Sequence, residues 1–101
     1  MIIVQGTFHL AADQRDDYLA QLTETQRISR SEPGCLEYVF APDPLADDRV
    51  VLSERWTSRA DLDAHLAALR DRRAAGADPQ PVQPQSSELV FFEATAIELD
   101  A

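Results

Sequence analysis

The sequence predicts an α+β fold of the ferredoxin-like type, in which the element order βαββαβ gives a four-stranded antiparallel sheet with two helices on one face. Three observations lead to this prediction. Apolar residues alternate in short segments near both ends of the chain and in its middle, which is typical of strands. Apolar residues at helical spacing occur twice between those segments. Stretches that contain Pro or Gly separate the elements.

The first strand and the first helix fill the N-terminal third of the chain. Ile2 to Leu10 alternates between two faces, which predicts a strand. Asp13 is the expected N-cap of a helix that runs to about Ser31. The helix should end there because Pro33 disfavours a helical conformation of the residue before it, and because Gly34 permits a sharp turn.

The middle of the chain predicts a β-hairpin. Arg49 to Trp56 is one expected strand, and a short polar loop joins it to the strand before it. The strand before it is expected at Cys35 to Phe40. Its alternation puts three side chains on one side of the sheet, namely Leu36, Tyr38 and Phe40.

The last third of the chain predicts a helix, a loop and a strand. Ser58 is the expected N-cap of a helix that ends near Arg73 or Ala75. Residues 76–87 form a Pro- and Gln-rich connection within the domain. The last strand is expected at Leu89 to Leu99, which is rich in Phe and β-branched residues.

Several predicted strands carry apolar residues on both faces. Ile2 and Ile3 lie on opposite faces of the first strand, and Phe91 lies opposite Val90 and Phe92 in the last. Two helices cover only one face of the sheet, so the second apolar face should also be buried. The simplest partner is the same face of a second copy, and we therefore expect a homodimer.

The composition predicts one acidic cytoplasmic domain over residues 1–101. The formal charge is −9 at pH 7, which disfavours nucleic acids and anionic membranes as partners. No apolar run approaches the roughly 20 residues that span a bilayer, and the N-terminus resembles a strand more than a signal peptide. Cys35 is the only cysteine, which excludes an internal disulfide and a cysteine-based metal cluster within one chain.

Three motifs resemble the antibiotic biosynthesis monooxygenase (ABM) family. They are Glu32-Pro-Gly-Cys-Leu-Glu-Tyr38, Glu54-Arg-Trp56-Thr-Ser58 and Leu62-Asp-Ala-His65-Leu66, and the match covers nearly the whole chain. The resemblance implies a dimeric α+β barrel of ferredoxin-like subunits. It also implies cofactor-independent oxygenation of quinols or polycyclic phenols, with dioxygen as the oxidant and no bound cofactor.

The sequence departs from the family after His65. Many members continue with a second helical histidine or an aromatic residue, whereas here Leu66 to Arg73 contains neither. Haem-degrading relatives use a histidine near that later position as an iron ligand, so haem binding is not expected. The two histidines of this chain do not show the spacing of a metal site either.

His65 is the predicted catalytic residue. It lies three residues after Leu62 and four before Leu69, so its ring should point toward the sheet or its rim. An imidazole in that position can act as a general base toward a phenol. The resemblance carries this role to His65.

The predicted substrate-binding residues are Trp56, Tyr38, Glu54 and Phe92. Trp56 offers a flat wall with one N–H donor, and Phe92 an apolar neighbour. Tyr38 would present a hydroxyl, and Glu54 would orient His65 or bind a substrate hydroxyl. We expect His65 and Trp56 to line one cavity that solvent reaches.

Each of these residues also has a purely structural explanation. Trp56 and Tyr38 can simply fill the core, and Glu54 can pair with an arginine or with His65. The alternative function is therefore a non-catalytic dimeric barrel that binds a small apolar ligand. An accessible cavity that contains His65 and Trp56 would favour the enzyme, and a filled one would favour the alternative.

Overall fold

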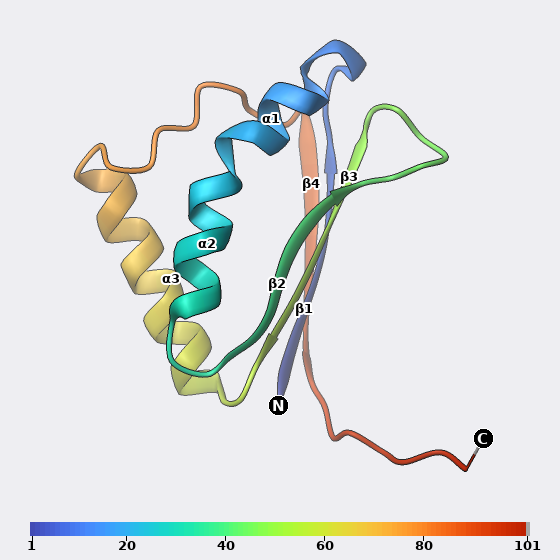
Figure 1. The fold of residues 1–101 in the computed structure, drawn as a ribbon, viewed down its shortest axis with the longest axis vertical. Coiled ribbons are helices and arrows are strands. Elements are labelled where there is room, and N and C mark those ends of the chain that lie inside the picture. The colour runs from blue at the N-terminus through green and yellow to red at the C-terminus, as the bar shows by residue number, and fades with distance from the viewer. Residues whose placement is uncertain (101) are drawn as a thin grey trace.

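The computed structural model describes residues 1–100 and confirms the α+β ferredoxin-like fold (Figure 1). Its single sheet has the order β2-β3-β1-β4, and all neighbouring strands are antiparallel. The strands are β1 Ile2–His9, β2 Cys35–Pro42, β3 Arg49–Trp56 and β4 Ser86–Glu93.

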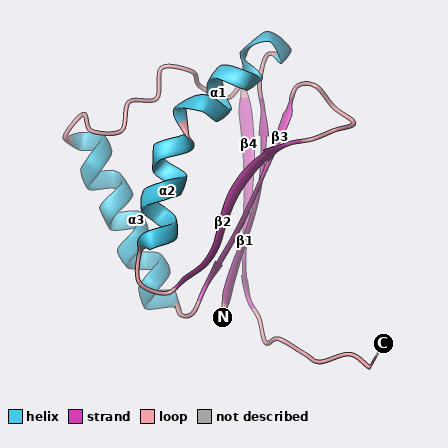
Figure 2. Ribbon diagram, viewed as in Figure 1, coloured by secondary structure: helices cyan, strands magenta, loops and turns pink. Residues whose placement is uncertain are grey.

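The helices lie together on one face of the sheet (Figure 2). They are the 3-10 turn η1 Ala12–Gln14, followed by α1 Arg15–Gln21, α2 Thr23–Ser31 and α3 Arg59–Ala74. None of the helices within residues 1–100 is long and apolar enough to cross a membrane.

The first helix differs from the single segment that the sequence predicts. Asp13 lies in η1, and α1 has Gln14 at its N-cap, so the prediction of Asp13 as the cap was wrong. The helix also breaks at Leu22, whose N–H donates to the carbonyl of Leu19 at 3.2 Å in a 3-10 pattern. Leu22 is buried in a core cluster with Leu10, Tyr18 and Val50, and the break keeps it there.

β4 begins and ends earlier than the predicted strand Leu89–Leu99. Its register pairs Ser86 with His9 and Glu93 with Ile2, the two ends of β1. Ala94 still donates to the carbonyl of Met1 at 2.8 Å, but β1 offers nothing to pair with beyond that point. A strand at the sheet edge ends where its only neighbour ends.

β2 contains a bulge that the alternation did not predict. The register with β3 shifts between Cys35 and Glu37, so Leu36 is pushed out and is 48% exposed. Leu36 was expected on the same side as Tyr38, and this was wrong. Cys35 takes its place and packs against the core cluster that contains Tyr38.

α3 starts where the sequence predicts. The Ser58 Oγ accepts a hydrogen bond from the Asp61 N–H at 3.2 Å and donates one to the Asp61 carboxylate at 2.9 Å. The Asp61 carboxylate also accepts from the Thr57 hydroxyl. This fixed start places Leu62 and His65, the two buried residues of α3, over the sheet.

Candidate active site

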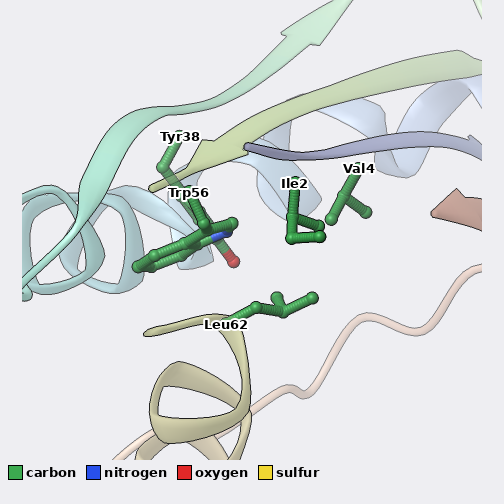
Figure 3. Packing of buried hydrophobic residues seen from close by; sticks show 5 residues of the cluster. All are labelled: Ile2, Val4, Tyr38, Trp56 and Leu62. Carbon is green, nitrogen blue, oxygen red and sulfur yellow. The ribbon is translucent and has the colours of Figure 1, made fainter. Parts of the chain in front are cut away.

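One core cluster lies where the first turns of α3 cross the sheet. Ile2 and Val4 from β1, Tyr38 from β2 and Trp56 from β3 point toward Leu62 of α3 (Figure 3). Trp56 is 0% exposed. The polar residues considered below are embedded in this cluster.

His65 lies against two of the aromatic residues. It is 2% exposed, and its ring centroid is 4.6 Å from that of Trp56 and 5.2 Å from that of Tyr38. The prediction was that His65 and Trp56 line one cavity, and the structure brings the two rings together. Their catalytic and binding roles stay predictions.

Glu54 is a buried carboxyl group beside these rings. Its Oε1 accepts a hydrogen bond from Trp56 Nε1 at 2.9 Å and lies 4.0 Å from His65 Nε2, which is too far for a hydrogen bond. Burial raises the pKa of Glu54, although the Trp56 N–H and the positive charge of a protonated His65 oppose the rise. The surroundings of Glu54 thus favour its protonated form more than water does.

Tyr38 faces the same cluster from the neighbouring strand, where it is paired with Glu54. It is 3% exposed, and burial is the main cause that raises the pKa of its phenol. Tyr38 therefore stays neutral and acts toward His65 as an aromatic neighbour with a hydroxyl group.

Glu32 completes the surroundings of His65, and the sequence analysis did not select it. Its Oε1 lies 2.7 Å from His65 Nδ1, and its side chain is only 16% exposed. Glu32 has an extended backbone after the last turn of α2, as Pro33 dictates for the residue before it. Glu32 belongs to the Glu-Pro-Gly motif, which served to predict the turn and the family resemblance but not a site residue.

The turn after Glu32 is held against α3 and the end of β3. Gly34 has φ +78°, and a Cβ there would lie 2.2 Å from the Asp61 carboxylate. Its carbonyl accepts from the Thr57 N–H at 2.9 Å. Only glycine fits this approach, which fixes the turn and therefore the position of Glu32.

A surface groove of about 390 Å³ lies next to the cluster, between α3 and the β1–β4 side of the sheet. Its apolar lining is Ile2, Leu62, Leu66, Phe91 and Phe92, and its polar lining is Arg59, Asp63 and Glu93. An apolar lining with a few polar groups is typical of small-molecule sites.

The groove and the cluster share a wall, because Ile2 and Leu62 belong to both. His65 and Trp56 lie behind this wall, at 2% and 0% exposure. The expected cavity that solvent reaches and that contains both rings is therefore absent from the described part of the chain. The physical reason is packing: Leu62, Ile2 and Trp56 are buried together in one core cluster.

Phe92 lies apart from the other predicted site residues. β4 pairs Phe91 with Val4 on the helix-covered face, and Phe92 with Ile3 on the open face. Phe92 lines the groove but does not join His65 and Trp56 in the cluster. Phe91, which the sequence analysis did not select, shares the face of the cluster.

The donors in the described residues do not form a metal site. Across residues 1–100, no three His, Cys, Asp or Glu side chains come together in a way that would hold a metal ion. The titratable side chains of the cluster include His65, Glu32 and Glu54, which can each hold a proton.

Comparisons with known proteins agree with this architecture. The sequence profile described as "Antibiotic biosynthesis monooxygenase" matches residues 1–75. A protein of Synechocystis sp., uncharacterized protein sll1783, is 36% identical over 65 residues. The aligned part covers 64% of this chain but only 44% of that protein, so the chain spans less than half of its relative.

Solved structures share the fold along nearly the whole chain. A Deinococcus radiodurans protein, proposed to be an antibiotic biosynthesis monooxygenase, superposes with a TM-score of 0.76 at 21% identity and covers 100% of both chains. Another structure described as an antibiotic biosynthesis monooxygenase has a TM-score of 0.74 at 27% identity, over 95% of this chain and 100% of that one. The structure of Rv0793 from Mycobacterium tuberculosis superposes with a TM-score of 0.73 at 23% identity. The match covers 95% of this chain and 96% of that one.

Proposed function

Because the chain belongs to the antibiotic biosynthesis monooxygenase family, we propose that it is a cofactor-independent monooxygenase. Its substrate is a phenolic, quinol or polyketide-like aromatic compound, and its oxidant is dioxygen. The observation that carries the proposal is a buried histidine that is held by a carboxylate, lies against a tryptophan ring and belongs to a core cluster that shares two residues with an apolar groove.

The proposed reaction begins with proton transfer. His65 takes the proton of a phenolic O–H, and the resulting phenolate is electron-rich enough to pass one electron to dioxygen. The two radicals combine at a ring carbon. One oxygen atom stays on that carbon, and the other leaves as water with two hydrogens from the substrate, so the substrate itself supplies the reducing electrons.

The groove gives the substrate its place. Phe91 and Leu66 hold an aromatic ring by apolar contact, and the polar rim favours one orientation. The proposal requires the bound ring to displace the side chains of Leu62 and Ile2 from Trp56. The ring then reaches His65, and the closed surroundings exclude water from the intermediate.

Oxygen consumption with a panel of quinols tests the proposal. We expect uptake by the wild type and a loss of about 10²–10⁴-fold in His65→Asn, because a positioned general base contributes a factor of that size. Asparagine retains an N–H near the place of Nδ1 but has no base at Nε2. His9→Asn, the same change at the only other histidine, is the matched control. Equal uptake by His65→Asn and wild type would refute the assigned role.

The second candidate is a non-catalytic barrel that binds a small apolar ligand. It is favoured by the burial of His65 and Trp56, since a core function alone explains two rings that solvent does not reach. The single tryptophan separates the candidates. Saturable quenching of Trp56 fluorescence by an aromatic ligand, without oxygen uptake for any quinol, would select the binding protein.

The homodimer is part of the same proposal. The sheet face without helices carries the half-buried apolar residues Ile3, Val39 and Val51, and β4 adds Val90 and Phe92 at 49% and 43% exposure. Polar residues such as Gln5 and Ser53 lie among them. A sheet face with exposed apolar residues of this kind is a candidate interface. Light scattering should give twice the chain mass of 11.2 kDa, and a value for one chain would contradict the dimer.

A further inference from the structure

The contact between Glu32 and His65 joins two segments that are far apart in the sequence. Glu32 Oε1 lies 2.7 Å from His65 Nδ1, across a separation of 33 residues. The Glu32 side chain is 16% exposed and that of His65 is 1% exposed, so the contact is shielded from solvent. A shielded hydrogen bond to a carboxylate is stronger than one on the surface.

The chemistry of this contact determines where the ring proton lies. An ionised carboxylate only accepts hydrogen bonds, so Nδ1 must carry the proton that it donates to Glu32. Nε2 is then the nitrogen with the free electron pair. The ionisable group on that side is Glu54, at 4.0 Å, and its Oε1 already accepts from Trp56.

We propose that Glu32 is a positioning residue for His65: it holds the proton on Nδ1 and so makes Nε2 the base. The effect of Glu32 on catalysis rests on the proposed function, whereas its effect on the position of the ring proton does not. When a phenolic O–H bond breaks and an Nε2–H bond forms, the imidazolium charge lies between the carboxylates of Glu32 and Glu54. The proton later leaves Nε2 for the oxygen that departs as water.

The turn of the Glu-Pro-Gly motif supplies the precision that this role needs. Pro33 directs the backbone of Glu32 out of the helix, and Gly34 packs against Asp61 in the first turn of α3. The turn therefore holds Glu32 beside the first turns of α3, where His65 lies. The titratable groups against the imidazole are Glu32, Glu54 and the neutral phenol of Tyr38, and Trp56 is its uncharged aromatic neighbour.

Nitrogen-15 NMR of the imidazole tests the proposal without any substrate. In long-range ¹H–¹⁵N spectra of neutral His65, we expect the wild type to carry its proton on Nδ1. In Glu32→Gln the amide can donate as well as accept, so we expect a mixture of tautomers or the Nε2–H form. His9→Asn assigns the signals, and Glu24→Gln is the control because Glu24 pairs only with the exposed Arg27. An Nε2–H wild type, or an unchanged Glu32→Gln spectrum, would overturn the proposal.

Kinetics provide the second readout. We expect Glu32→Gln to lower kcat by at least about 10-fold, with little change in KM, but by less than the about 10²–10⁴-fold contribution of a general base. Glu32→Asp keeps a carboxylate and should restore part of the rate. A kcat equal to that of Glu24→Gln would contradict a catalytic effect. If the wild type turns over no quinol, the proposed function fails, whereas the spectra still decide the role of Glu32.

Discussion

The cluster under α3 and the edge strand β4 distribute polar and apolar groups in opposite ways. His65, Glu54 and Trp56 are 2%, 6% and 0% exposed, whereas four apolar residues of β4 are 43–52% exposed, namely Leu89, Val90, Phe91 and Phe92. In most proteins the ionisable groups face water and the aromatic groups do not. The cluster departs from that rule because it buries ionisable groups, and β4 departs from it because it exposes apolar ones.

The two departures have different physical meanings. A buried carboxyl group or imidazole destabilises the fold unless partners satisfy it, and here Trp56 and Glu32 are those partners. Exposed apolar residues cost the folded state little, but they favour any ligand or chain that covers them. Substitutions in the cluster should therefore change stability and chemistry, and those in β4 should change binding.

Trp56→Ala should have the largest effect on stability. It removes a fully buried indole and leaves Glu54 without its donor, so we expect a loss of about 3–5 kcal/mol in the free energy of unfolding. Urea denaturation followed by far-UV circular dichroism measures it. Phe92→Ala on β4 should cost less than about 1 kcal/mol. Similar losses in both variants would remove the distinction between the two regions.

Leu62→Ala should join the groove to the cluster. Leu62 is 3% exposed and is buried in the same cluster as Trp56, so we expect destabilisation of about 2–5 kcal/mol. The same change should expose Trp56, which acrylamide quenching of its fluorescence detects. Leu66→Ala is the matched control, since Leu66 lines the groove but is 43% exposed. If Leu62→Ala leaves the quenching unchanged, Leu62 is not the barrier between groove and cluster.

Glu54→Gln should change the pH dependence of stability. Because the folded pKa of Glu54 lies above its ordinary value of 4.5, the protonated form stabilises the fold. This contribution is complete below that ordinary value and is lost as pH rises through the raised pKa. Glutamine can still accept from Trp56 and does not titrate, so the variant should lack this decline. Urea denaturation from pH 4 to pH 9 measures it, with Glu37→Gln at an exposed position as control. A variant curve parallel to that of the wild type would contradict a raised pKa of Glu54 in the folded protein.

The fold was predictable because the periodicities are local. β3 begins at Arg49 and ends at Trp56, as its alternation predicts, and Ser58 caps α3 because an N-cap depends on the next few residues only. The end of β4 was not predictable in the same way. It depends on the length of β1, about 90 residues earlier in the chain, through a register that alternation leaves undetermined.

The position of the site residues was also predictable in part. The spacing from Leu62 placed His65 toward the sheet, and the strand motif placed Trp56 and Glu54 on one face, where the structure has all three. Glu32 was missed because its contact with His65 is tertiary, and Phe92 was chosen over Phe91 because the register decides which of them faces the helices. The burial of Trp56 with Leu62 is a matter of packing, which a sequence pattern does not resolve.

Phe91→Ser and Phe92→Ser should have the smallest effects on stability, and they divide β4 into its two faces. Both side chains are about half exposed, at 52% and 43%, so each change should cost less than about 1 kcal/mol. Phe91 shares its face with Val4 beside the groove, so its loss should weaken ligand quenching of Trp56 and leave the mass in solution unchanged. Phe92 shares the open face with Ile3, so its loss should weaken the proposed dimer more than the binding of a ligand. If both variants lose both properties equally, the two faces of β4 act as one surface and the division fails.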